Sequence, residues 1–257
     1  MTRILKIAAA LALACIAQVA RADLPPIGFA YVHTARNAPS ISSTQAQNIG
    51  TGDIVPAENL EIKCGENQRA FIIFSNRTVL EIGTNSSLKI VAFRQSPPFS
   101  FSFYDDAEKT RSLLEMKIEK GNVYLYGLRP RMTSSAKIST PFGNFEIKSA
   151  KFVMGVREEG LKIAVLDGQS TFKGLNGKTD FIQNKQRGSL TKEKSNAKYP
   201  LKIEYLASIE EDAIDGEFAD CKTVFNSVEF SAKNGKMRAE RVTPKEFLKR
   251  PERHETP

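Results

Sequence analysis

The most constraining feature of this sequence is a long series of short apolar segments separated by glycine. Thirteen of the sixteen glycines fall between Gly50 and Gly188, and they divide that stretch into segments of roughly 8–12 residues. Several segments alternate apolar and polar residues with a period of two, which is the period of a β-strand. No strand is followed by a long helical pattern, so a parallel α/β sheet is not favoured. The pattern predicts an all-β fold: an antiparallel two-layer β-sandwich or jelly roll, or a β-helix-like stack of short strands.

Three hairpins are predicted from their turn residues. Residues 69–82 read "RAFIIFSNRTVLEI", and we expect Asn76 in this turn, like Asn85 in the next, to adopt the left-handed conformation. Residues 113–126 read "LLEMKIEKGNVYLY", with Gly121 in the predicted turn. Residues 161–172 read "LKIAVLDGQSTF", where Asp167 and Gly168 are typical hairpin residues. The segment 71–74 is apolar on both faces, so it is predicted to lie inside a two-layer structure or under a covering loop.

Residues 1–22 have the parts of an export signal. Arg3 and Lys6 give a positive start, an apolar run follows, and Ala20 and Ala22 are the small residues that precede a cleavage site. The run is shorter than the ~20 apolar residues that a membrane-spanning helix needs. We therefore expect cleavage after Ala22 and a periplasmic or secreted protein. An uncleaved anchor and lipid attachment at Cys15 are the alternatives.

Export also determines how the charge and the remaining cysteines are interpreted. The chain is basic, with a formal net charge of +8 at pH 7, but its Lys and Arg are scattered among acids. This distribution does not favour nucleic acid, whereas an anionic envelope polymer or a peripheral contact with the membrane agrees with it. In an oxidising compartment we expect Cys64 and Cys221 to form a disulfide. Chain-entropy models assign such a long loop about 4–5 kcal/mol of stabilisation.

No catalytic or metal-binding constellation is apparent. His33 and His254 are the only histidines, and they provide neither a zinc ligand set nor a base beside a nucleophile. The acids of 210–220 lack the alternation of a calcium loop and are interpreted as a solvated helix face. Asp105 and Asp106 lie beside basic residues in a polar excursion, which favours a solvated loop over a carboxylate pair. We expect no enzyme activity, no cofactor and no metal.

Tyr126, Arg129 and Arg131, in the stretch "YGLRPRM", form a candidate binding patch. Its basic and aromatic side chains are suited to a glycan or an anionic lipid. The alternative is a loop at a sheet edge whose charges prevent edge-to-edge pairing.

The composition changes from about residue 203. The stretch "IEYLASIEEDAIDGEFADCKTVF" has apolar residues at helical spacing and acids near its start, which predicts a short helix with Ser208 as its N-cap. The last residues, 232–257, carry many charges and few apolar groups. They are predicted to be a disordered basic tail.

Several segments occur in the order typical of a FecR domain and resemble its motifs. They are "GTGDIVPAENLEIKCGENQRAFIIF", "SNRTVLEIGTNSSLKI", "LEMKIEKGNVYLY", "KISTPFGNFEI" and "LKIAVLDGQSTF". FecR is the extracytoplasmic domain of iron-dicitrate-type sensor-regulators and also occurs in exported envelope proteins. The resemblance runs from about residue 50 to 190. Together with the segments described above, it gives a signal peptide at 1–22, a polar lead-in at 23–48, a FecR-like β-domain at 49–190, an extension with a helix at 191–231 and the tail at 232–257.

The resemblance implies an all-β, exported, non-catalytic domain, and it does not supply a ligand. Because the sequence also shows no catalytic constellation, we expect a protein of the cell envelope that binds a partner protein or an envelope polymer. One alternative is a periplasmic relay in a FecR-type signalling pathway linked to TonB-dependent iron uptake. No cytoplasmic regulatory segment precedes the signal, so we expect a partner to supply one in that case. A second alternative is a carbohydrate-active enzyme with carboxylates from distant positions.

Overall fold

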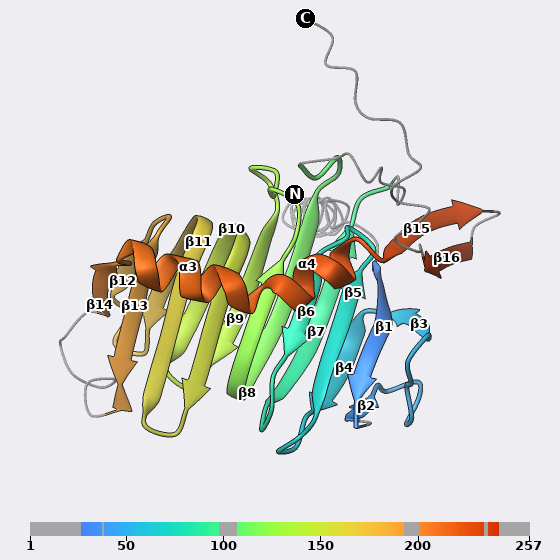
Figure 1. Cartoon of the computed structure of the whole chain (residues 1–257), viewed down its shortest axis with the longest axis horizontal. Coiled ribbons are helices and arrows are strands. Elements are labelled where there is room, and N and C mark those ends of the chain that lie inside the picture. Colours follow the sequence, from blue (N-terminus) through green and yellow to red (C-terminus); the bar gives the residue numbers. More distant parts are fainter. Residues whose placement is uncertain (1–26, 38, 98–106, 193–200, 234–235, 242–257) are drawn as a thin grey trace, which may run out of the picture.

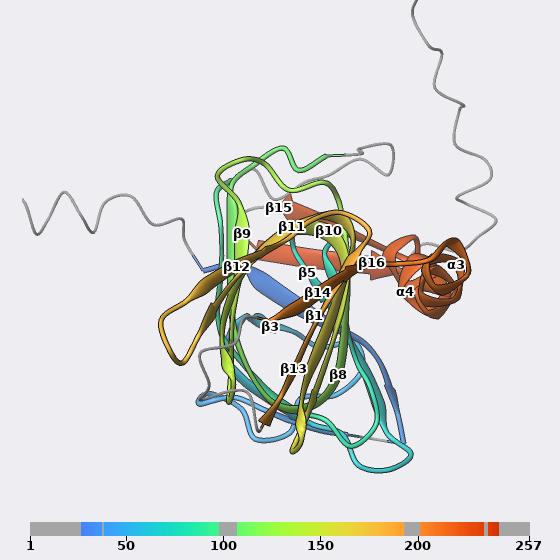
Figure 2. The same cartoon turned by 90° about the vertical axis from the view of Figure 1, so that its left-hand side faces the viewer.

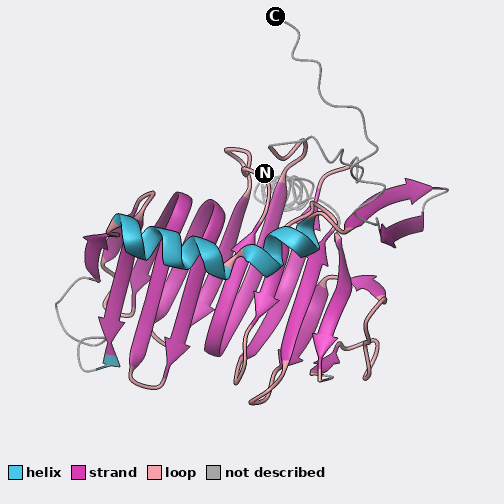
Figure 3. Cartoon of the chain, viewed as in Figure 1, coloured by secondary structure: helices cyan, strands magenta, loops and turns pink. Residues whose placement is uncertain are grey.

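The computed structural model describes residues 27–37, 39–97, 107–192, 201–233 and 236–241. Strands make up most of this part of the chain, and two short helices follow near its C-terminal end (Figure 1, Figure 3). The predicted all-β class is confirmed, and the predicted helix is two helices in tandem. The strands are β1 (Phe29–Arg36), β2 (Ser40–Ser42), β3 (Ile54–Pro56), β4 (Glu58–Lys63), β5 (Arg69–Phe74), β6 (Val79–Ile82), β7 (Ser87–Gln95), β8 (Ser112–Tyr126), β9 (Ser135–Thr140), β10 (Gly143–Arg157), β11 (Gly160–Gly174), β12 (Thr179–Ile182), β13 (Gln186–Thr191), β14 (Lys202–Tyr205), β15 (Val228–Lys233) and β16 (Lys236–Arg241), and the helices are α3 (Ser208–Glu217) and α4 (Ala219–Phe225).

One sheet, with 14 strands among the described residues, folds over on itself into two layers. The long strands β8, β10 and β11 run through both layers. The first half of β8 pairs with β7 and β9, whereas its second half pairs with β6 and β10. Layer 1 contains β14, β13, β6, β5, β1 and β3 with one half of each long strand, and layer 2 contains β12, β9, β7, β4 and β2 with the other halves. Figure 2 shows the layers edge-on, with both helices outside layer 1.

Glycines mark the points at which β8 and β11 pass from one layer to the other. Gly121 has a φ of +102° and Gly168 a φ of +121°. A Cβ atom at Gly121 would lie 2.0 Å from Ser86 Oγ, and one at Gly168 would lie 2.3 Å from the Lys148 carbonyl oxygen. The hairpin turns predicted at these two positions are therefore wrong. Glycine does supply the left-handed conformation, but the strand continues because its two halves pair with different strands in different layers.

The main apolar core lies between the two layers. Phe74 of layer 1 contacts Phe93 of layer 2, with ring centroids 4.7 Å apart. Strand β5 is buried on both faces, as predicted for residues 71–74. Ile72 and Phe74 belong to the core between the layers, whereas Phe71 and Ile73 belong to a second apolar cluster outside layer 1. This second cluster is covered by α4 and by β15 and β16.

The turn between β5 and β6 contains an unexpected left-handed residue. Arg77 has a φ of +68°, whereas the left-handed conformation was predicted for Asn76. Asn76 instead accepts a hydrogen bond at Oδ1 from the Thr78 backbone N–H at 3.0 Å. The Arg77 guanidinium lies 4.1 Å from the Phe225 ring centroid and donates to the Phe225 carbonyl, and these contacts offset the cost of the conformation. Asn85 has a φ of +53°, as predicted.

The start of the predicted disordered tail is ordered. Residues 228–233 and 236–241 pair as an antiparallel hairpin. Val228 and Phe230 are buried in the second apolar cluster, and the Arg241 guanidinium donates to the Tyr31 hydroxyl and the His33 carbonyl. Apolar side chains at alternate positions, with Met237 and Ala239 on the second strand, therefore attach this charged segment to the outside of layer 1. The predicted signal, Cys15 and the tail beyond residue 241 lie outside the described residues.

Candidate functional site

Helix α4 is attached to the outside of layer 1 by apolar contacts. Phe218, between α3 and α4, is fully buried. Its ring lies edge-on to Tyr124 at 5.7 Å and 6.3 Å from the Tyr126 ring, measured between centroids. The Lys151 ammonium lies 5.1 Å from the Phe218 ring centroid. Aromatic pairs and a cation over a ring both add to simple burial, so this contact fixes the helix on the sheet.

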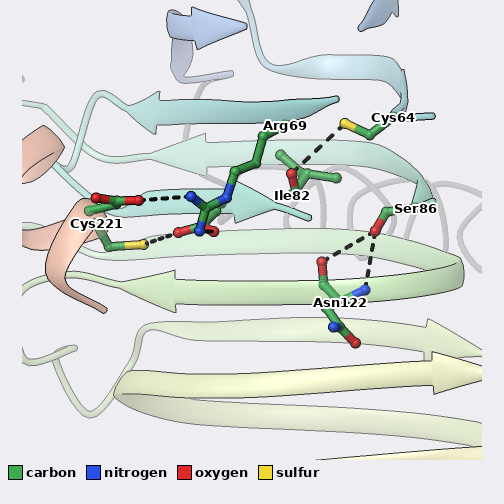
Figure 4. Close-up of polar contacts among 8 residues, drawn as sticks. Cys64, Arg69, Ile82, Ser86, Asn122 and Cys221 are labelled. Atoms are coloured by element: carbon green, nitrogen blue, oxygen red, sulfur yellow. Dashed lines mark hydrogen bonds and ion pairs between the residues drawn. The ribbon is translucent and has the colours of Figure 1, made fainter. Parts of the chain in front are cut away.

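A buried carboxylate lies under α4. Glu81 of β6 is fully buried and forms an ion pair with Arg69 of β5, whose guanidinium also contacts Asp220 of α4 at 2.8 Å. The Cys221 thiol donates to Glu81 Oε2 at 3.2 Å (Figure 4). Burial raises the pKa of Glu81, and the Cys221 hydrogen bond and the Arg69 charge oppose that effect. The cluster joins β5, β6 and α4. Burying these charges costs free energy, and removing one partner would cost more because it leaves the other charge buried and unpaired.

Helix α3 is attached differently. None of its residues is buried, and Ile209 is 79% exposed. Ile214 packs against the second apolar cluster, and ion pairs connect the rest of the helix to its surroundings. Lys151 of β10 contacts Asp215, Lys185 contacts Glu211 at 2.9 Å, and Arg187 of β13 contacts Glu210. Apart from Lys151, whose side chain is 13% exposed, the paired side chains are 28–54% exposed, so water and salt screen the pairs and limit their contribution to stability. Helix α3 is therefore held more weakly than α4.

A groove of about 720 Å³ lies between α3 and layer 1. Glu210, Ile214 and Glu217, at helical spacing, form its roof. Outward side chains of β8, β10, β11 and β13 form its floor, and the opposite faces of these strands carry the core. The floor includes Asn122, Tyr124, Val153, Gly155, Arg157, Lys162, Ala164, Arg187, Ser189 and Thr191. The volume is in the range of small-ligand sites, and the lining mixes apolar and charged groups.

Part of the sheet matches a known protein family. Residues 61–169 match the family model described as FecR protein. This segment is a FecR domain. Two crystal structures, each of a candidate anti-sigma factor from Parabacteroides distasonis ATCC 8503, are similar to the chain at 9% and 10% identity, with TM-scores of 0.42 and 0.41. Each comparison covers 71% of this chain and 99% of the other. No curated protein matches the chain.

The FecR domain and the C-terminal extension build the groove together. Strands β8 and β10 and the first half of β11 lie inside the matched segment, whereas β13 and α3 lie beyond it. The same division applies to the charge cluster, where Arg69 and Glu81 belong to the FecR domain and Asp220 and Cys221 to the extension. The extension therefore covers one face of the FecR domain.

The disulfide predicted between Cys64 and Cys221 is not formed, and both residues are free buried thiols. Cys64 belongs to the core between the layers and contacts the Ile82 carbonyl at 3.8 Å, whereas Cys221 belongs to the cluster outside layer 1. The two residues therefore lie on opposite faces of layer 1, and Figure 4 shows them well apart. Burial raises the pKa of the Cys64 thiol to about 11 and raises the pKa of Cys221 as well.

The structure does not bring the predicted patch of Tyr126, Arg129 and Arg131 together as one surface. The Tyr126 ring packs edge-on against Phe225, 5.3 Å away, beneath α4. Arg129 is exposed and lies 4.0 Å from Asp167. Arg131 donates to the Lys109 carbonyl, which ties one loop to another. The tyrosine and the two arginines therefore serve different local contacts.

Other predicted site elements can be placed as well. The acids of 210–220 do lie on a helix, but Ala207 occupies the N-cap position predicted for Ser208, and its N–H donates to the Glu210 carboxylate at 3.0 Å. Asp105 and Asp106 lie outside the described residues. Within the described residues, no group of three or more His, Cys, Asp or Glu side chains is placed to hold a metal ion. No helix among them is long and apolar enough to cross a membrane.

Arg69 and Glu81 were not predicted as site residues. The available signal was Glu81 itself, the one charged residue in the apolar strand "VLEI". A carboxylate at such a position is buried only if it is paired. Its partners Asp220 and Cys221 are distant in sequence, and only the folded chain identifies them.

Proposed function

We propose that this protein is an exported, non-catalytic FecR-domain protein of the cell envelope that works by binding a partner protein. The match to FecR supports a regulatory rather than a catalytic role. The predicted signal at residues 1–22 supports a location outside the cytoplasm. Within FecR-type signalling, the protein acts as a periplasmic relay.

The observation that carries this proposal is the groove beneath α3. It is open to solvent, its floor belongs largely to the FecR domain, and its roof is a helix with no buried residue. A roof attached by ion pairs and by the partly buried Ile214 can move with little disturbance of the core, because α4 is anchored separately through Phe218. A partner segment therefore reaches the floor at low cost in stability.

Site-specific photo-crosslinking in the envelope of the source organism tests the proposal. One variant carries p-benzoylphenylalanine in place of Thr191, which is exposed at the groove. A matched control carries it in place of Glu146, which is exposed on β10 in layer 2. We expect a discrete crosslinked protein from position 191 and none from position 146. The absence of a product at position 191, or the same product from both positions, would refute the proposal.

A further inference from the structure

We infer that the outward face of β10, β11 and β13 is a docking surface for an acidic helical segment of the partner protein, and that α3 occupies it in the free chain. This inference rests on the proposed function and names the chemistry of the partner. Four cationic side chains define the surface, called the basic face below: Lys151 and Arg157 of β10, Lys162 of β11 and Arg187 of β13. On the neighbouring strand, Glu204 pairs with Arg187 and offsets one of these charges.

The chain's own α3 indicates what this face accepts. Its sequence, SIEEDAIDGE, contains five acids and no basic residue. Two of the acids, Glu210 and Asp215, pair with Arg187 and Lys151 of the basic face. Charge complementarity of this kind selects acidic segments and disfavours basic ones.

Helix α3 leaves part of the basic face unused. Arg157 and Lys162 are exposed at the groove, and neither has an acidic partner within 4 Å in the described part of the chain. Lys162 lies opposite Gly155 in the register of β10 and β11, so no β10 side chain stands directly beside it. A longer acidic helix would reach these two cations as well as the two that α3 already contacts. Such a helix has more ionic partners than α3 and competes with it.

The weak attachment of α3 permits the exchange. It has no buried side chain, whereas the adjoining α4 is anchored by Phe218, Cys221 and Val224. The two helices are separate elements because Phe218, between them, has a φ of −84° and a ψ of 2°. Gly216, just before this point, has open space around it and restrains the backbone little. Helix α3 can therefore leave the basic face while α4 remains in place.

Fluorescence anisotropy at low salt tests the inference with the mature protein. The probe is a fluorescein-labelled peptide that contains residues 207–217 twice in tandem. A variant that neutralises α3, Glu210→Gln with Glu211→Gln and Asp215→Asn, should bind the probe at least ten times more tightly than the natural chain. Adding Arg157→Glu and Lys162→Glu to that variant should remove the gain. The matched control adds Lys89→Glu and Lys117→Glu, a half-buried and an exposed cation of layer 2, and should retain the gain.

Each result decides between specific alternatives, provided that circular dichroism shows every variant to be folded. Equal binding by the natural and the neutralised chains overturns the inference, as does equal loss in the basic-face and control variants. The inference is also overturned if dextran sulfate displaces the labelled probe as well as unlabelled peptide does at the same total charge. The basic face would then be a general polyanion site. If these tests fail while position 191 still crosslinks to a protein, the proposed function stands and the partner chemistry is wrong.

Discussion

Phe218 is the side chain expected to hold the C-terminal helices on the FecR domain, and Phe218→Ala tests that role directly. The ring is fully buried between Tyr124 and Tyr126, with the Lys151 ammonium against it. Replacing a buried Phe by Ala typically costs about 3–5 kcal/mol, from lost transfer energy and the cavity that remains. The two aromatic contacts, at roughly 0.5–1.5 kcal/mol each, place this site in the upper part of that range.

Hydrogen exchange detected by mass spectrometry is the appropriate assay because it separates helix release from global unfolding. The Lys222 amide, which donates to the Phe218 carbonyl at 2.9 Å, reports on the docked α4. A cost of 3–5 kcal/mol corresponds to a loss of protection of roughly 100- to 5,000-fold. The measured loss of protection cannot exceed the value that corresponds to the free energy with which the helices dock on the sheet. Amides in the centres of β8 and β10 should keep their protection.

Ile209→Ala provides the matched control. Ile209 lies on α3 and is 79% exposed, so its truncation should change protection by less than about 0.5 kcal/mol. Unchanged protection of α4 in Phe218→Ala would refute the anchoring role. Loss of protection throughout the sheet would show that the helices and the FecR domain unfold as one unit.

Three further predictions concern titratable groups that are buried or half-buried. Unfolded in urea without reductant, the mature protein should take up two equivalents of iodoacetamide, at Cys64 and Cys221, whereas the native protein at pH 8 should react at neither because burial raises both thiol pKa values. Burial, together with the Arg241 charge, lowers the pKa of His33 from 6.5 to about 4. As pH falls, the unfolded chain therefore binds a proton at this histidine before the folded chain does. Stability should then fall as pH decreases from about 6.5 towards 4, and His33→Gln should remove this slope in urea unfolding. Burial raises the pKa of Glu81 above 4.5, so as pH falls the folded chain binds this proton before the unfolded chain does. The stability of the natural chain relative to Glu81→Gln should therefore be greatest below pH 4.5 and should decrease as pH rises through the raised pKa.

The outcomes that contradict these predictions are specific. Alkylation only after reduction would show that the two cysteines are paired. A slope that persists in His33→Gln would assign the acid sensitivity to another group. A natural chain that gains stability relative to Glu81→Gln as pH rises would show that the Arg69 charge outweighs burial and lowers the Glu81 pKa.

Local sequence patterns determined the all-β class, the buried strand β5 and the order of the FecR motifs, because alternation and turn residues act over a few neighbours. The same patterns failed at Gly121 and Gly168. A glycine with positive φ fits a hairpin turn and a bend between layers equally well. The choice depends on which strands pair with each half of β8 and β11, and those strands are distant in sequence.

The cysteines and the groove depended on tertiary structure in the same way. Composition and compartment suggested that Cys64 and Cys221 would pair, but only the fold places layer 1 between them. The acids of α3 were visible in the sequence, as were Lys151 and Arg187. That these charges face each other across a groove follows from packing α4 against Tyr124 and Tyr126, which places α3 over the sheet. The sequence thus determined the type of strand and its motifs through local periodicity, and the long-range pairing of strands decided which side chains meet.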